Sequence, residues 1–203
     1  MLDTKAKAAH VWKRDALDWY VEEDFVTRAL AKVERFVGSV LDPCCGQGNI
    51  VTALLASGVE AVGSDIVERA PEGTPWFLGT ADFREVAAIA QPNICMNPPF
   101  FRAKGAEAFI RKALSLASGK VAAFTDIKFL ASDGRAKGLY AEFPPNRIWS
   151  ISPRPSCPPG EYLLAGGEAD GGTADYVWLV WDLTAPPPQA AQFLWLRAEA
   201  VLG

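Results

Sequence analysis

A short stretch near the middle of the chain, NICMNPPF, ends an apolar run with an asparagine, two prolines and a phenylalanine. Neither Pro98 nor Pro99 can donate a ladder hydrogen bond, so a strand that contains the apolar run has to stop at Asn97. The chain then leaves along a rigid path, because each proline ring fixes its own φ angle. An asparagine and an aromatic residue on either side of a rigid corner raise the question of what this corner positions.

A second candidate site is the glycine-rich stretch VLDPCCGQGNIVTALLASG, which has the pattern of a strand, a tight turn and a helix. Gly46 and Gly48 permit the turn and a close backbone approach to a ligand. Asp65 follows Gly46 by 19 residues, at the end of the next predicted strand, where a carboxylate is suited to binding a ribose diol. Ile50 and Val51 break the full GxGxxG fingerprint, which counts against NAD or FAD and favours another nucleoside cofactor. The alternative is that the glycines only shape the turn.

Helical and strand patterns alternate along the chain. Helical spacing of apolar residues predicts helices over residues 24–36, 49–58, 84–90 and 103–117. Short apolar runs predict strands over residues 38–42, 60–65, 75–82, 93–97, 120–130, 147–154 and 175–183. The Pro- and Gly-rich segment 155–174 is predicted to be a long surface loop, and residues 190–202 a final helix or a docked tail.

This alternation predicts an α/β fold, with a mainly parallel sheet and helices on both of its faces. The last two strands lack an intervening helix and are expected to pair as an antiparallel hairpin at one edge. The length fits a single domain over residues 1–203. Ligands of such sheets bind at the carboxyl ends of the strands. That rule places the glycine turn, Asp65, Asp82 and Asn97 along one rim.

The bulk properties limit the class of protein. The formal net charge is −4 and the pI about 5.1, so the whole chain lacks a strongly basic nucleic-acid footprint, although a local patch stays open. Cys44, Cys45, Cys95 and Cys157 lack the spacing of a metal site and are predicted to be reduced thiols, so no metal is expected. Neither a signal-peptide core nor an apolar run of membrane-spanning length is present. A cytoplasmic protein without a membrane partner is therefore expected.

The stretches LDPCCGQGNI, VGSDI, ADF and NPPF follow one another along the chain. In this order they resemble the S-adenosylmethionine-dependent amino-methyltransferases, above all the small phage and prophage N6-adenine DNA methyltransferases. The resemblance covers most of the chain and implies a Rossmann-like class I methyltransferase fold with S-adenosylmethionine as the cofactor. By this resemblance the cofactor-binding residues are Asp42, Pro43, Cys44, Gly46, Gly48, Asp65, Ile66, Asp82 and Phe83. For Asp82 and Phe83 the alternative is a helix cap and a core residue.

The resemblance also assigns the chemistry of NPPF. An exocyclic amine on an aromatic ring is a poor nucleophile, because its lone pair is delocalised into the ring. The side-chain oxygen of Asn97 and the backbone carbonyl of Pro98 would accept the amine hydrogens, and the Pro98-Pro99 corner would hold both acceptors in place. Phe100 would stack on the base. Methyl transfer would then be a direct displacement without a covalent enzyme intermediate.

One segment departs from the family. Many relatives carry Tyr-x-Thr-Pro before the glycine turn, where this chain has Tyr20-Val21-Glu22-Glu23, so no cofactor contact is carried over to it. A base inside a duplex has to be flipped out before its amino group is reached, which requires cations and a stacking surface. The predicted substrate-binding residues are Arg102, Lys104 and Arg154. Further candidates are Lys128, Arg135, Lys137, Tyr140, Arg147 and Trp149, for which the alternative is a solvated charge or a core aromatic.

Three functions remain open. The first is methylation of adenine N6 in DNA with little sequence selectivity, because no separate target-recognition domain is evident. Loops 131–147 and 153–175, a homodimer or another partner would then supply specificity. The second is methylation of RNA adenine or of a protein glutamine amide, since the same motif serves both chemistries. The third is a non-catalytic cofactor-binding module, against which the intact motif argues.

Overall fold

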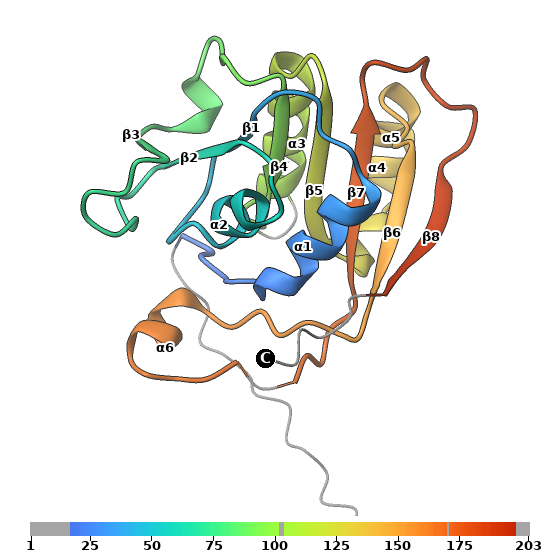
Figure 1. The fold of residues 1–203 in the computed structure, drawn as a ribbon. Coiled ribbons are helices and arrows are strands. Elements are labelled where there is room, and N and C mark those ends of the chain that lie inside the picture. Colours follow the sequence, from blue (N-terminus) through green and yellow to red (C-terminus); the bar gives the residue numbers. More distant parts are fainter. Residues whose placement is uncertain (1–16, 102–103, 170, 198–203) are drawn as a thin grey trace, which may run out of the picture.

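The computed structural model describes residues 17–101, 104–169 and 171–197, which form one eight-stranded sheet in the order β3-β2-β1-β4-β5-β7-β6-β8 (Figure 1). The strands are β1 (Val40–Asp42), β2 (Ala61–Asp65), β3 (Phe77–Thr80), β4 (Asn93–Met96), β5 (Lys120–Asp126), β6 (Arg147–Ser152), β7 (Tyr176–Asp182) and β8 (Gln192–Arg197). All neighbouring strands are parallel except β7, which is antiparallel to both β5 and β6. The predicted α/β fold with a mainly parallel sheet is confirmed. The expectation of one domain over residues 1–203 includes residues outside this description and stays a prediction.

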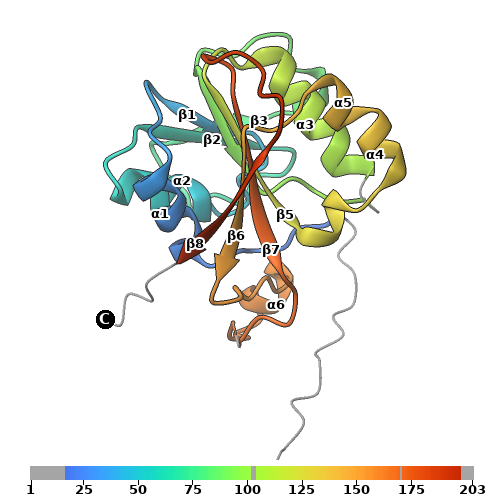
Figure 2. The same cartoon turned by 90° about the vertical axis from the view of Figure 1, so that its right-hand side faces the viewer.

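Helices cover both faces of the sheet. They are α1 (Asp24–Val33), α2 (Asn49–Ala56), α3 (Lys104–Leu116), α4 (Asp133–Lys137), α5 (Leu139–Glu142) and α6 (Gly160–Leu164), with 3-10 turns η1 (Phe83–Glu85) and η2 (Ile127–Leu130). Figure 2 shows α1 and α2 on one side of the twisted sheet and α3, α4 and α5 on the other. No helix in the described part of the chain is long and apolar enough to cross a membrane.

Two apolar cores fill the space between the sheet and these helices. Leu30 of α1 packs in one core with Trp178 of β7, whose indole N–H donates to the Val26 carbonyl at 3.1 Å. Ile110 of α3 packs in the other core with Leu179 of β7. Successive residues of β7 therefore enter opposite cores, as the period of two along a strand requires. A sheet that is buried on both faces holds its strand ends rigidly, which suits it to positioning a site.

The carboxyl-terminal part of the chain differs from the sequence prediction. The sequence predicts a helix or a docked tail over residues 190–202, but Gln192–Arg197 form β8, which pairs in parallel with β6, and residues 198–202 lie outside the described residues. Leu194 and Leu196 point inward, while Phe193 and Trp195 are exposed, a strand-like alternation that three preceding prolines obscured. The antiparallel β6–β7 pair is confirmed, but β8 forms the edge of the sheet.

The secondary structure predicted from the sequence is wrong for two further segments. The helix expected over residues 84–90 is only the 3-10 turn Phe83–Glu85, because seven residues give too few hydrogen bonds to stabilise an isolated helix. The segment 155–174 is not simply a surface loop. It contains α6, and its Pro158 carbonyl accepts from Val21 N at 2.9 Å while Gly160 N donates to the Trp19 carbonyl at 3.0 Å. The prolines hold this segment extended, so it can pair with the residues that precede α1.

Candidate functional site

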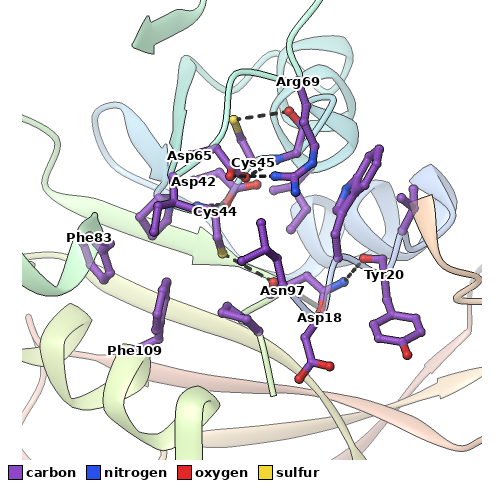
Figure 3. A pocket seen from close by; sticks show the side chains of 18 of the residues that line it. Asp18, Tyr20, Asp42, Cys44, Cys45, Asp65, Arg69, Phe83, Asn97 and Phe109 are labelled. Carbon is purple, nitrogen blue, oxygen red and sulfur yellow. Dashed lines mark hydrogen bonds and ion pairs between the residues drawn. The ribbon is translucent and has the colours of Figure 1, made fainter. Parts of the chain in front are cut away.

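A pocket with a cavity volume of about 150 Å³ opens where β1, β2 and β4 end (Figure 3). It lies at the carboxyl rim of the parallel strands, where the topology predicts ligand binding. Ten of the residues predicted for the site line it, namely Asp42, Pro43, Cys44, Gly46, Asp65, Ile66, Asp82, Phe83, Asn97 and Pro99. The fold therefore brings the glycine turn and the NPPF corner, 49 residues apart in the sequence, to one cavity.

The turn after β1 requires glycine for two reasons. Gly46 and Gly48 have φ angles of +52° and +90°, in the left-handed region that glycine tolerates best. A Cβ atom at Gly46 would lie 2.5 Å from the indole nitrogen of Trp19, and one at Gly48 would lie 2.2 Å from the ring of Trp76. Gly48 does not line the pocket, so its place in the turn is explained by conformation and packing.

Asp65 at the end of β2 is already bound by donors of the chain. Its Oδ2 accepts from Gly46 N at 2.8 Å, and its Oδ1 accepts from Val67 N and from Nη1 of Arg69, both at 3.0 Å. Arg69 also lies over the Trp19 ring, 4.6 Å from its centroid. Because a carboxylate has about four acceptor positions, a ribose diol would find one of them open. Binding both hydroxyls at Asp65 thus requires Arg69 to move.

The Asn97 side chain is held in one orientation. Its Nδ2 donates to the Tyr20 carbonyl at 3.0 Å and to Oε2 of Glu22 at 2.7 Å. These two acceptors use both amide hydrogens, Cys157 Sγ is a longer contact of Nδ2 at 4.0 Å, and no donor in the described part of the chain bonds to Oδ1. Cys44 Sγ donates to the Asn97 backbone carbonyl at 3.4 Å, which ties the NPPF corner to the glycine turn. Figure 3 shows Asn97 between Cys44 and Tyr20.

The segment before α1 contributes residues that the sequence analysis did not assign to the site. Residues 17–22 line the pocket, although this is where the chain departs from the family pattern. The Asp18 carboxylate accepts a hydrogen bond from Phe101 N, just after the NPPF corner. The antiparallel bridge between Tyr20 and Pro159 holds the segment in place from the other side. No local sequence pattern marks Glu22 for this role, because it begins the acidic run Glu22-Glu23-Asp24 and resembles the solvated start of a helix.

Acidic side chains dominate the charge of the pocket. Its charged lining residues are Asp18, Glu22, Asp42, Asp65, Asp82, Arg69 and Arg84. Glu22 and Asp42 are 5% and 2% exposed, and neither forms an ion pair with a described residue. Burial raises the pKa of Glu22 to about 7, against the hydrogen bonds that stabilise its charged form, and raises the pKa of Asp42 well above its usual range. A cation bound beside these two carboxyl groups would favour their charged forms, so the site is suited to a cationic ligand.

Asp82 and Phe83 combine both predicted roles. Asp82 caps η1, accepting from Arg84 N at 3.0 Å, and the side-chain hydrogen bond from Arg84 lowers its pKa. Phe83 is buried and packs against Phe109 of α3, with the ring centroids 5.6 Å apart. Both nevertheless line the pocket, so a cap and a core position are compatible with ligand contact.

Two residues of the NPPF motif lie outside the pocket lining. Pro98 is buried, and the Phe100 ring meets Phe129 of η2 edge to face at a centroid distance of 6.4 Å. Phe101, which the sequence analysis passed over, lines the pocket and is 41% exposed. The stacking role of Phe100 stays a prediction, and the next residue supplies the aromatic ring at the cavity.

The predicted substrate-binding cations are not gathered at the pocket. Arg102 lies outside the described residues, and Lys104 is exposed at the start of α3 but does not line the cavity. Arg154 is exposed and pairs with Asp175 at 2.6 Å. Arg147 and Trp149 have a structural role instead, because both side chains donate hydrogen bonds to the buried Glu34.

Of the remaining candidates, Lys128 is exposed in η2 and does not line the pocket, and the other three have local contacts. Lys137 pairs with Asp133 at 2.8 Å on α4, and Arg135 lies over the Phe129 ring at 4.1 Å. Tyr140 donates to the Phe129 carbonyl at 3.3 Å. Within the described residues no group of three or more His, Cys, Asp or Glu side chains could hold a metal ion, and the four cysteines are free.

Comparison with solved structures identifies the fold. Over 78% of this chain and 81% of the other, a proposed RNA methyltransferase from Pyrococcus horikoshii matches with a TM-score of 0.57 and 16% identity. A modification subunit of a proposed type I restriction enzyme from Vibrio vulnificus matches over 82% of this chain and 45% of that one, with a TM-score of 0.58 and 16% identity. The chain has the Rossmann-like fold of methyltransferases.

A third structure agrees with this assignment. A TehB-like SAM-dependent methyltransferase from Corynebacterium glutamicum matches over 79% of this chain and 87% of its own, with a TM-score of 0.50 and 14% identity. No protein-family model matches the chain, and no curated protein matches it. At these identities the similarity shows the fold alone, so the function has to be argued from the site.

Proposed function

We propose that this protein transfers a methyl group from S-adenosylmethionine to the N6 amino group of adenine in DNA. The observation that carries the proposal is the orientation of Asn97. Both of its amide hydrogens are bound by Tyr20 and Glu22, which leaves Oδ1 as an acceptor beside the pocket. An acceptor fixed before the substrate arrives is what activation of an amino group requires.

The residues of the pocket fit the proposed cofactor. S-adenosylmethionine carries a positive sulfonium and an ammonium group, and the buried carboxyl groups of Glu22 and Asp42 lie in a pocket whose two arginines pair with other acids. The turn at Gly46 brings backbone close to the cavity, and Asp65 and Asp82 offer acceptors for the ribose and the adenine amino group. The shared fold with a SAM-dependent methyltransferase supports the same cofactor.

The chain's own groups would act on the amine and not on the methyl donor. When bound, S-adenosylmethionine would supply the methyl carbon, and its C–S bond would break with the electron pair left on sulfur. The amine lone pair would form the new C–N bond, and one amine proton would leave to water. Asn97 Oδ1 and the Pro98 carbonyl would accept the two amine hydrogens and so localise the lone pair on nitrogen. The Pro98-Pro99 corner limits reorganisation of these acceptors during the reaction.

DNA is the substrate that we favour. An adenine has to leave its stack to reach the pocket, and Phe101 offers a half-exposed ring there for stacking. Lys104 and Arg154 are exposed cations for the phosphate backbone. Solved structures of this fold include a modification subunit of a proposed restriction enzyme and a proposed RNA methyltransferase, so RNA is tested beside DNA.

The test is transfer of labelled methyl from S-adenosylmethionine to unmethylated double- and single-stranded DNA, followed by mass analysis of the nucleosides. We expect N6-methyladenine with the wild-type chain, and a loss of turnover of at least a hundredfold in Asn97→Ala, on the scale of removing one oriented group in an active site. The cofactor affinity of Asn97→Ala should stay within a few-fold of wild type.

Other outcomes separate the alternatives. Product on RNA or on a glutamine-containing peptide, and none on DNA, would move the activity to that substrate. Cofactor binding without turnover on any of these substrates would support a binding module. Full turnover of Asn97→Ala on DNA would overturn the acceptor role of Asn97.

A further inference from the structure

Glu22 lies on the segment that precedes α1 and is hydrogen-bonded to the Asn97 amide. Its side chain is buried, 5% exposed, and its Oε2 accepts from Asn97 Nδ2 at 2.7 Å. The Tyr20 carbonyl accepts from the same nitrogen at 3.0 Å. The family resemblance assigns no role to this segment, because Tyr20-Val21-Glu22-Glu23 differs from the Tyr-x-Thr-Pro pattern.

A side-chain amide has two orientations that exchange its oxygen with its nitrogen. If the Asn97 amide turned over, Oδ1 would face the Tyr20 carbonyl and the Glu22 carboxylate, which are both acceptors. The Tyr20 carbonyl, the Glu22 carboxylate and Nδ2 would then all lose these two partly buried hydrogen bonds, which is unfavourable. An ionised Glu22 therefore selects the orientation in which Oδ1 is left for the substrate.

We propose that Glu22 is a positioning residue, whose carboxylate holds the Asn97 amide in its active orientation and whose protonation releases it. A protonated Glu22 has an O–H donor, which can bond to Oδ1 of the turned amide. The turned amide would then present Nδ2, a donor, to an amine that needs an acceptor. This inference rests on the proposed methyl transfer to an amino group.

The surroundings of Glu22 make its protonation accessible near neutral pH. Burial raises its pKa to about 7, while the hydrogen bonds to its backbone N–H and to Asn97 act in the opposite direction. No lysine or arginine in the described ranges forms an ion pair with it. The titratable groups that share its pocket or act on it electrostatically are Asp18, Tyr20, Asp42, Cys44, Cys45, Asp65, Arg69, Asp82, Arg84, Cys95 and Cys157.

The first measurement is the pH profile of kcat for labelled methyl transfer, at saturating S-adenosylmethionine and DNA, for the wild type, Glu22→Gln and Glu22→Ala. In the wild type we expect kcat to rise at least tenfold from pH 5.5 to 8.5, with an inflection near 7. Glu22→Gln can still accept from Asn97 but cannot ionise, so its profile should lose this inflection. Glu22→Ala should lower kcat at least tenfold at pH 8.5, where the saturating S-adenosylmethionine separates this effect from any change in cofactor affinity.

A matched control is Glu23→Gln. Glu23 is the adjacent acid, but its Oε2 accepts from Ser156 N at 2.7 Å and does not contact Asn97. Its variant should keep the wild-type inflection. An inflection near 7 that survives unchanged in Glu22→Gln, or wild-type kcat in Glu22→Ala, would overturn the positioning role.

A second readout does not depend on turnover. The side-chain ¹⁵N–¹H signals of Asn97, assigned with Asn97→Ala, are followed against pH in the full chain without substrate. We expect them to shift with a midpoint near 7 in the wild type and Glu23→Gln, and not in Glu22→Gln. If the wild type transfers no methyl group, the proposed function fails, and these signals alone test whether Glu22 ionisation controls the Asn97 amide. A midpoint that depends on Glu22 supports this control, and the absence of such a midpoint overturns it.

Discussion

The backbone N–H of Gly46 donates to Oδ2 of Asp65 at 2.8 Å, so the end of β2 is fastened to the turn that follows β1. One carboxylate thereby serves two purposes. It shapes the glycine turn, and it lines the pocket in which we place the ribose of the cofactor. Removal of this carboxylate should consequently lower both the cofactor affinity and the free energy of unfolding.

Asp65→Ala should weaken S-adenosylmethionine binding at least tenfold and lower the free energy of unfolding by about 1–3 kcal/mol, because Gly46 N–H would lose its buried acceptor. Calorimetric titration and urea unfolding without ligand measure the two effects. Glu68→Ala, at an exposed acid three residues further along, is the control and should change neither. Unchanged cofactor affinity in Asp65→Ala would remove Asp65 from the ribose site.

Gly48→Ala tests whether the turn depends on packing as well as on conformation. A Cβ atom there would combine a φ of +90° with a distance of 2.2 Å to the Trp76 ring. Gly58→Ala is the matched control, since Gly58 has a φ of +77° and no atom within 4 Å of its Cβ position. We expect Gly58→Ala to cost about 1–2 kcal/mol, and Gly48→Ala to cost more. Equal urea midpoints for the two variants would show that Trp76 moves away freely.

The parts of the site that the sequence predicted are those with local signals. The glycine turn at Gly46 and the end of β4 at Asn97 follow from strand patterns and from the backbone chemistry of glycine and proline. The placement of both on one rim follows from the parallel sheet, because the carboxyl ends of parallel strands share an edge. These predictions required no knowledge of which side chains touch.

The parts that the sequence did not predict depend on contacts between distant residues. Glu22 reaches Asn97 across 75 residues of chain, and no local pattern marks that approach. The same holds for the pairing of Val21 with Pro158 and for Arg147, which resembles a solvated cation in the sequence but binds Glu34. β8 was missed because an Ala- and Pro-rich approach obscured its alternation.

Glu34 joins α1 to the amino ends of β5 and β6. These strand ends lie on the side of the sheet opposite to the carboxyl ends that form the pocket. It is 2% exposed and accepts from Lys120 at 2.7 Å, Trp149 at 2.9 Å and Arg147. Glu34→Ala would leave the Lys120 and Arg147 charges without this buried partner, and should lower the free energy of unfolding by about 3–5 kcal/mol. Cofactor affinity should not change, because the pocket is distant.

The pH dependence of this effect has a defined sign. Burial alone would raise the pKa of Glu34, but the hydrogen bonds from Arg147, Lys120 and Trp149 together lower it below the usual value of 4.5. The stability from Glu34 is therefore fully present above pH 4.5 and is lost as pH falls through the lower, folded pKa. Urea unfolding between pH 3 and 7 should show the wild type converging on Glu34→Ala at the acid end. Asp133→Ala, which breaks an exposed pair with Lys137, is the control, and a constant gap between wild type and Glu34→Ala would contradict the assignment.

Arg154 is a predicted phosphate contact that the structure leaves accessible. Its side chain is 60% exposed and its partner Asp175 is 53% exposed, so the pair contributes little to stability and the guanidinium can exchange Asp175 for a phosphate. Arg154→Ala should weaken DNA binding uniformly across sequences and lower the slope of log affinity against log salt by about one. Arg35→Ala, at an exposed arginine beside Glu34 and away from the rim, should leave both values unchanged. Fluorescence anisotropy with a labelled duplex over a salt series measures them, and equal salt slopes for wild type and Arg154→Ala would exclude Arg154 from the DNA interface.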